Sequence, residues 1–124
     1  MEIERVRIVD KPWGHEEIFA LVEGKFCGKV LHVDAGEALS LQYHERKDEV
    51  IAVQRGRCRM QLGEHESRMT THDLEAGDSV HLAAGVRHRI EALTELVLLE
   101  ASTTELEDVV RLEDRYGREG TSGP

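Results

Sequence analysis

The sequence predicts a single all-β domain built from antiparallel strands. Short apolar stretches recur every eight to twelve residues with turn-forming residues between them, which is the spacing of a β-sandwich or barrel. Glycines mark the gaps between these stretches, and no long helical pattern competes with them. At 124 residues the chain is long enough for one domain and too short for two ordinary ones.

Nine strands follow from this spacing. In chain order they are predicted at residues 17–21, 29–33, 38–43, 49–54, 57–62, 70–74, 79–82, 88–92 and 95–101. Seven glycines lie at or beside the gaps between them: Gly24, Gly28, Gly36, Gly56, Gly63, Gly77 and Gly85. A positive φ is useful at such breaks, so the order of strands and glycines predicts an antiparallel arrangement.

The stretch at 57–62 indicates how the strands are oriented. Charged or polar residues alternate there with Cys58, Met60 and Leu62, so these three should face a core while the arginines face water. One dry face and one wet face is the pattern of an antiparallel sheet. Cys27 and Cys58 lie far apart without a CxxC motif, so we expect two reduced thiols.

The pattern changes after Ser102, where acidic and basic residues are mixed. Thr104 is placed to cap a short helix, with Glu107 three residues later completing a capping box. We therefore expect a short helical or irregular tail within one domain at 1–118, and disorder over residues 119–124.

The charge balance argues against nucleic acid as a partner. The formal net charge is -9, whereas nucleic-acid binding depends on Lys and Arg neutralising phosphates. A small anionic ligand remains compatible, because a local group of cations can bind it whatever the overall charge. No apolar run approaches the roughly 20 residues that cross a bilayer, and the N-terminus is too charged for a signal peptide. We expect a soluble, cytoplasmic protein with a small-molecule substrate.

The stretch LSLQYHERKDEV at 39–50 carries a candidate metal site. If 38–43 is a strand that runs into a turn, Gln42 and His44 project from the same face. Glu49 can return to that face on the next strand, and His88 on a second hairpin offers a fourth group. Such ligands suit Mn, Fe, Co, Ni or Zn, and the lack of Cys ligands argues against structural zinc. A solvated, charged hairpin explains residues 45–49 almost as well.

Two longer stretches resemble the motifs of the cupin superfamily. GEALSLQYHERKDEVIAVQRG at 36–56 resembles G-x5-HxH-x3,4-E-x6-G, which supplies three metal ligands, and GDSVHLAAGVRHRIEA at 77–92 resembles G-x5-PxG-x2-H-x3-N, which supplies the fourth. The matching positions are Gly36, His44, Glu49, Gly56, Gly77, Gly85 and His88, whereas Gln42, Ala83 and Ala92 replace the first His, the Pro and the Asn. The resemblance implies a cupin jelly-roll β-barrel, also called a double-stranded β-helix, with Gln42, His44, Glu49 and His88 as metal ligands.

A narrower resemblance covers residues 11–118. The blocks KPWGHEEIFA, LSLQYHERKDEV and LEDVVRLEDRYGR resemble small single-domain cupins related to type II phosphomannose isomerase, and the C-terminal cupin part of bifunctional mannose-phosphate isomerase/guanylyltransferases. In that group a Gln takes the place of the first motif His, as Gln42 does here. His15 stands where the group has the Tyr of KPWGYE.

This resemblance implies a metal-dependent aldose–ketose isomerase that acts on a sugar phosphate such as mannose 6-phosphate. The metal would stabilise an enediolate while a base moves a proton between carbons. The candidate catalytic residues are His81 and Lys47, and the candidate substrate-binding residues are Lys29, Arg87 and Trp13. Trp13 is equally suited to covering one end of the barrel. Cupins often pair, so we also expect a homodimer.

Two other functions stay open from the sequence. The same four ligands can hold Fe(II) and leave room for oxygen, as in a cupin dioxygenase. A third possibility is a non-catalytic barrel that binds a sugar or a partner protein.

Overall fold

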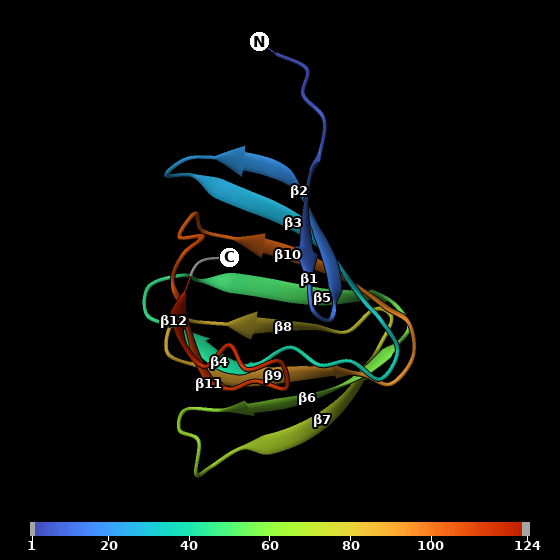
Figure 1. Cartoon of the computed structure of the whole chain (residues 1–124), viewed down its shortest axis with the longest axis vertical. Coiled ribbons are helices and arrows are strands. Elements are labelled where there is room, and N and C mark those ends of the chain that lie inside the picture. Colours follow the sequence, from blue (N-terminus) through green and yellow to red (C-terminus); the bar gives the residue numbers. More distant parts are fainter. Residues whose placement is uncertain (1, 123–124) are drawn as a thin grey trace.

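A computed structural model describes residues 2–122 of the chain as a two-sheet β structure (Figure 1). It contains twelve strands and no helix among the described residues. Their bounds are β1 Arg7–Lys11, β2 Gly14–Val22, β3 Phe26–Val33, β4 Leu41–His44, β5 Glu49–Arg55, β6 Arg57–Gly63, β7 Thr70–Glu75, β8 Ser79–Leu82, β9 Arg87–Ala92, β10 Leu96–Ser102, β11 Val109–Glu113 and β12 Gly120–Ser122. All nine predicted strands are present, and the all-β jelly-roll prediction is confirmed.

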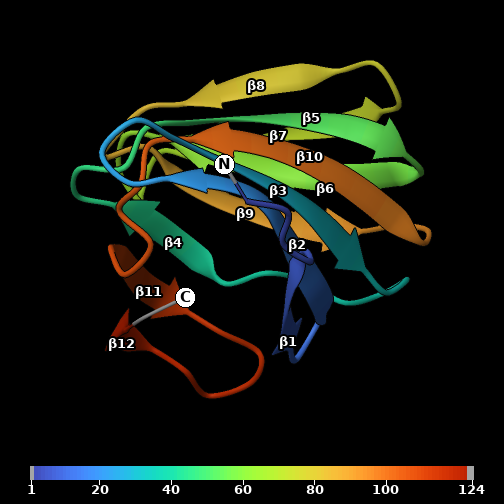
Figure 2. The ribbon, with the colours of Figure 1, turned by 90° about the horizontal axis from the view of Figure 1, so that it is seen from above.

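The strands form two six-stranded sheets with antiparallel pairing throughout. The first sheet has the order β1-β2-β3-β10-β5-β8 and the second β12-β11-β4-β9-β6-β7. Seen from above in Figure 2, β3, β10 and β5 lie over β9 and β6, so the two sheets face one another. Side chains on the inner faces therefore meet between the sheets and form the core.

The core follows from the two-residue alternation of the strands. In β6, Cys58 and Met60 are fully buried, and Leu62 packs against the core, whereas the arginines between them are exposed. Leu96 and Leu98 of β10 enter the same core from the opposite sheet. Burying one such side chain contributes about 1.5–3 kcal/mol, so the core is a main source of the stability of the fold. Both cysteines are buried free thiols, as expected.

The segment after β10 differs from the sequence prediction. The described residues from Thr103 to Asp108 form turns rather than a capped helix. The Thr104 hydroxyl accepts a hydrogen bond from the backbone N–H of Gly24 instead of capping a helix of its own. The segment is only a short crossing between β10 in one sheet and β11 in the other, so it has no room for a helix of useful length.

The C-terminal end of the described chain contains one more strand, within the segment 119–124 for which disorder was expected. Gly120–Ser122 pairs with Val109–Glu113 as strand β12 at the edge of the second sheet. Residues 123 and 124 lie outside the described part of the chain. In that part, no helix is long and apolar enough to cross a membrane.

Candidate metal centre

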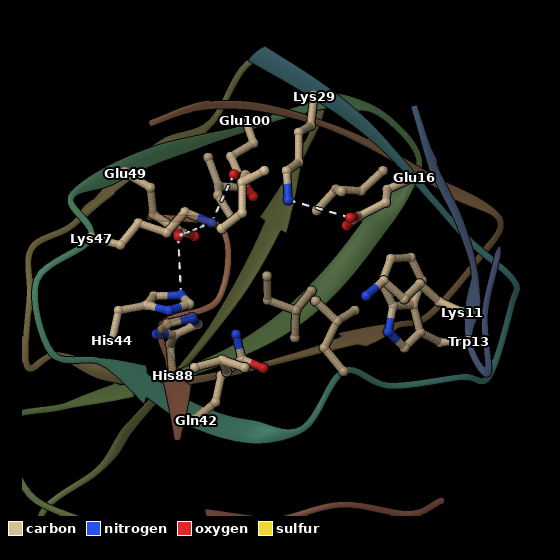
Figure 3. Close-up of a pocket in the computed structure, with 16 residues that line it drawn as sticks. Lys11, Trp13, Glu16, Lys29, Gln42, His44, Lys47, Glu49, His88 and Glu100 are labelled. Atoms are coloured by element: carbon tan, nitrogen blue, oxygen red, sulfur yellow. Dashed lines mark hydrogen bonds and ion pairs between the residues drawn. The ribbon is translucent and has the colours of Figure 1, made fainter. Parts of the chain in front are cut away.

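A cavity of about 70 Å³ lies between the two sheets, and core residues such as Leu31, Ile51 and Ile90 form part of its wall. Its polar lining falls into two groups, which face one another in Figure 3. One group contains His44, Glu49 and His88, and the other contains Glu16 and Lys29. This cavity is where the metal ligands expected from the sequence come together.

Three strands from both sheets position the first group. His44 ends β4 and Glu49 begins β5, so a short turn joins them across the two sheets. His88 lies on β9, which pairs with β4 through the register Gln42↔His88. All three side chains are buried, with 6%, 4% and 2% of the residue surface exposed, respectively. One ligand atom from each lies within 4.8 Å of the others.

Backbone carbonyls determine which nitrogen of each imidazole faces the cavity. The Nδ1 atom of His44 lies 3.0 Å from the Asp108 carbonyl oxygen, and Nδ1 of His88 lies 3.0 Å from that of Val86. A carbonyl can only accept, so both Nδ1 atoms must carry the proton. Each Nε2 atom is then left with a lone pair, which is the arrangement of metal-binding histidines.

Two atoms of this group are buried without a good hydrogen bond. Nε2 of His44 lies 3.1 Å from Oε2 of Glu49, yet neither atom has a hydrogen-bond partner of acceptable geometry among the described residues. With Nδ1 of His44 protonated, Nε2 and the carboxylate oxygen face one another with lone pairs and no proton between them. Leaving such groups unpaired costs about 1–3 kcal/mol each, and a divalent cation between them would satisfy both. The residues thus fit a metal.

The titration behaviour of the group agrees with this fit. Burial opposes ionisation of Glu49, but contact with His44 and the charge of Lys47 lower its pKa to about 2. Burial lowers the pKa of His88 below its ordinary value, although Glu49 opposes the shift. A carboxylate and a neutral imidazole are the protonation states that bind metal.

Gln42 lines the same cavity, as expected from the sequence. Its Oε1 atom accepts a hydrogen bond from the Ser40 hydroxyl at 2.5 Å. The amide is therefore held at the edge of the cluster by its neighbour two residues earlier. It can serve as a further ligand only if its oxygen is shared with Ser40 or turned from it.

A buried ion-pair network supports Glu49. Nζ of Lys47 lies 3.2 Å from Oε2 of Glu49 and 3.0 Å from Oε2 of Glu100. Burial alone would lower the pKa of Lys47, but Glu100 and Glu49 raise it above its ordinary value. Lys47 is thus a cation that holds Glu49 in place, which does not suit it to accept a proton.

Asp108 organises the turn that carries Lys47. Its carboxylate accepts hydrogen bonds from the backbone N–H groups of Glu45, Arg46 and Lys47, while its carbonyl faces His44. The partial burial of Asp108 opposes ionisation, but these three hydrogen bonds lower its pKa. One residue between β10 and β11 therefore fixes both the turn and the orientation of a ligand.

The second polar group is a buried ion pair on the opposite wall. Nζ of Lys29 donates a hydrogen bond to Oε1 of Glu16 at 3.3 Å, and both side chains are almost completely buried. Trp13 lines the cavity and also belongs to the apolar core, so both roles expected for it remain compatible with its position. Lys29 lies in the cavity, as its candidate role requires.

Two other candidates lie away from the cavity lining. His81 is 61% exposed and its Nε2 lies 2.6 Å from the Asp48 carboxylate. It alternates with buried Leu82 on β8 and so points to the outer side of the sheet. Arg87 pairs with Glu66 at 2.9 Å and stacks on the Tyr43 ring. The structure therefore does not bring His81 or Arg87 to the metal ligands.

Sequence reasoning overlooked the acidic residues of the cavity. Glu16 points inward with Ile18, and Glu100 points inward with Leu98 and Leu96. The available signal was the two-residue alternation, because a Glu in register with buried Leu residues must face the interior. Asp108 gave no comparable signal, since its role depends on a turn that is distant in sequence.

Comparison with known proteins supplies a family. A family model described as "Cupin domain" matches residues 29–101, which include His44, Glu49 and His88. The chain is 32% identical over 117 residues to mannose-1-phosphate guanylyltransferase ManC of Salmonella typhimurium, covering 90% of this chain and 23% of the relative. It spans about a quarter of the length of the curated relatives that it matches.

Solved structures agree on the fold. The capsular polysaccharide assembling protein CapF of Staphylococcus aureus superimposes with a TM-score of 0.78 at 16% identity, covering 90% of this chain and 33% of that chain. Bacillus subtilis oxalate decarboxylase, a protein with Mn(II) centres, superimposes with a TM-score of 0.70 at 19% identity, covering 85% of this chain and 29% of that chain. At these identities the likeness concerns architecture alone.

Proposed function

The chain belongs to the cupin domain family, and from this premise we propose that it is a metal-dependent isomerase that interconverts an aldose phosphate and a ketose phosphate. A relative named for mannose 1-phosphate makes a phosphorylated mannose the first substrate to test. Mannose 6-phosphate and fructose 6-phosphate are the pair that we assign.

One observation carries the proposal: a metal-suited cluster and a buried carboxylate share one cavity. His44, Glu49 and His88 converge on one side, and Glu16 lies with Lys29 on the other (Figure 3). A substrate between them would be held at its oxygens and exposed at its carbons to a proton acceptor. Isomerisation of a hydroxy-aldehyde needs both parts.

A divalent metal held by His44, Glu49 and His88, with Gln42 as a further group, would supply a Lewis acid for the substrate's carbonyl and hydroxyl oxygens. The protein's own part is to keep both Nε2 atoms unprotonated through the Nδ1 hydrogen bonds and to hold Glu49 against Lys47. Manganese belongs among the metals to test because oxalate decarboxylase, of similar fold, has Mn(II) centres. Iron, cobalt, nickel and zinc suit the same ligands.

We assign the transfer of the carbon-bound proton to Glu16. Conversion of an aldose to a ketose removes a proton from C2 and returns one to C1, while a hydroxyl proton moves from O2 to O1, so atoms and electrons balance. Lys29 donates to Oε1 of Glu16, which leaves Oε2 as the atom to accept the proton.

The size of the cavity decides how a sugar phosphate would enter. About 70 Å³ holds roughly five water molecules at about 15 Å³ each, which is too little for a whole hexose phosphate. The reacting C1–C2 end would occupy the cavity and the phosphate would stay at its mouth. Lys11 lines the Trp13 end and forms no ion pair with any described residue, so we assign it to the phosphate.

Metal content and isomerisation, measured together, test this function. The purified protein, loaded with Mn, Fe, Co, Ni or Zn in turn, should interconvert mannose 6-phosphate and fructose 6-phosphate. In D₂O the product should carry deuterium at the carbon that receives the proton. The variant His44→Ala should hold less metal per chain and lose turnover in proportion.

Other outcomes point elsewhere. Metal without isomerisation or deuterium exchange would retain the metal site and reject the reaction. Oxygen consumption by the iron-loaded protein would then favour the dioxygenase alternative. A protein that binds no metal in the cavity would reject the whole assignment.

A further inference from the structure

A second group of potential metal ligands lies on the outer face of the first sheet. His15 and Glu17 are on β2 and His32 is on β3, two strands that run side by side at the top of Figure 1. Successive side chains of a strand point to opposite faces. Because Glu16 points into the cavity, its neighbours His15 and Glu17 point away from it. The group is therefore separate from the candidate metal centre.

The strand register brings the two histidines together. His15 and His32 are directly opposite in the antiparallel pairing of β2 and β3. Their rings stack with centroids 4.4 Å apart and an angle of 13° between their planes. Oε1 of Glu17 lies 2.9 Å from Nε2 of His32 and 3.7 Å from Nε2 of His15. Side chains opposite in a sheet are held by the ladder, so this arrangement is preorganised.

These atoms are close to the spacing that a metal requires. One ligand atom from each residue lies within 4.8 Å of the other two. A tetrahedral ion with bonds of about 2.1 Å places its ligands about 3.4 Å apart, so binding requires the two stacked rings to tilt toward a common point. Nε2 of His32 is buried and has no properly directed hydrogen bond among the described residues, although Glu17 is near. A cation would give this nitrogen a partner.

The surroundings leave the site open to water. The three side chains are about one-third exposed, at 39%, 32% and 35%. Asp10 of β1 is opposite His15 in the register and adds negative charge on the same face. Arg55 lines the shallow hollow beside Glu17 and His32 and opposes cation binding there. Mutation of Arg55 would therefore remove a positive charge that opposes cation binding at this group.

We propose that His15, Glu17 and His32 form a second, surface-exposed site for a divalent transition metal, with water completing the coordination. Two imidazoles and one carboxylate suit Zn²⁺, and three protein ligands leave a position for solvent. A bound ion cross-links β2 and β3 from outside, on the strands whose inner faces carry Glu16 and Lys29. The site is independent of the proposed isomerase activity.

Zinc titration of the whole chain tests the proposal, with stoichiometry from equilibrium dialysis and elemental analysis. The wild type should bind two Zn²⁺ per chain. His15→Gln and His32→Gln should each lower the zinc affinity of the surface site and leave the cavity site unchanged. Loss of an outer-shell partner lowers metal affinity about 10- to 100-fold, so loss of a direct ligand should lower it at least as much. Arg55→Gln should tighten the same site. The exposed His72, on β7 in the other sheet, is the matched control, and His72→Gln should still bind two.

Two results would overturn the proposal. The first is unchanged zinc stoichiometry and affinity in both His15→Gln and His32→Gln. The second comes from crystals of the wild type soaked in Zn²⁺: anomalous diffraction should place an ion between His15 and His32, and the lack of a peak there would reject the site. This second measurement requires no variant to fold.

Discussion

Glu16 is the residue on which the proposed chemistry depends most. Replacing it by Gln keeps the shape of the side chain and removes its ability to accept a proton. We expect Glu16→Gln to lower kcat by about 10²- to 10⁴-fold, the usual contribution of a general base, with cavity metal content unchanged. Steady-state kinetics and elemental analysis check this.

Glu23→Gln, at an exposed position just after β2, is the matched control and should retain full activity. If Glu16→Gln keeps wild-type kcat, Glu16 is not the base. If it loses metal as well as activity, the variant has disturbed the centre rather than the proton transfer.

Cys58 should make stability depend on pH in the alkaline range. Burial, with the charges of Asp73 and Asp78, raises its pKa to about 11 in the folded protein. An unfolded thiol titrates near 8.5. The folded state therefore binds the proton more strongly, and the stabilisation is present below about pH 8.5 and lost as the pH rises toward 11.

Urea unfolding of the wild type and of Cys58→Ala, at about pH 7.5 and about pH 10.5, measures this contribution. The variant loses core packing at both pH values, so only the difference between them is informative. Lys and Tyr residues titrate in both proteins and cancel. An equal fall in unfolding free energy for both proteins would contradict the assignment to Cys58.

At the residue scale, the sequence allowed prediction of those cavity residues that are close to one another in the chain. Gln42 and His44 lie on β4 and Glu49 begins β5, so one short turn separates the three in the chain. Glu16 and Glu100 escaped notice because each lies in a different strand, and only the sheet order places those strands around one cavity. The side chain of His81 lies outside the cavity, because on β8 it points to the face opposite that of the buried Leu82.

At the scale of the element, Gly56 makes possible the tight turn that leads from β5 in the first sheet to β6 in the second. Its φ is +87°, and a Cβ atom there would lie 2.1 Å from the backbone oxygen of Glu95. Gly56→Ala combines backbone strain with a contact against a backbone atom that cannot easily move. We expect it to lower the free energy of unfolding by about 1–3 kcal/mol, measured by urea denaturation.

Gly77 provides the matched comparison. It has a similar φ of +101° in the turn between β7 and β8, but a Cβ atom would meet nothing within 4 Å. Gly77→Ala should therefore cost less than Gly56→Ala. Equal losses would mean that the left-handed backbone alone, without the contact to Glu95, limits the Gly56 turn.

The sequence predicted a strand wherever alternating apolar residues were bounded by a glycine. All nine segments predicted in this way are strands in the structure. The structure adds β1, β11 and β12: charged residues interrupt the apolar pattern of β1 and β11, and β12 is only 3 residues long. β1 and β12 lie at sheet edges, so each pairs on one side only. The expected cap at Thr104 did not form, because a distant backbone N–H uses its hydroxyl.

At the scale of the whole molecule, the candidate metal ligands come from both sheets. Glu49 belongs to the first sheet, and His44 and His88 belong to the second. This arrangement could not be read from periodicity, since β4 pairs with β9 and β11, which are distant in sequence. The family resemblance supplied it in the sequence prediction.

A metal ion that binds only when the two sheets are packed together should stabilise the entire fold. At a free metal concentration 100 times Kd the gain is about 2.7 kcal/mol, or roughly 10 °C in Tm for a domain of this size. Calorimetry of the His15→Gln protein with and without a chelator isolates the cavity metal. The same comparison with His44→Ala added should show no shift, and a persisting shift would place the ion elsewhere.

The division of these ligands between the two sheets also has a kinetic consequence. His44 and His88 are 44 residues apart in the chain, and the pairing that unites them is non-local, a kind of contact that forms slowly. If the centre closes after the rate-limiting barrier, metal cannot hasten refolding. Bound metal would instead slow unfolding and so lengthen the lifetime of the folded chain.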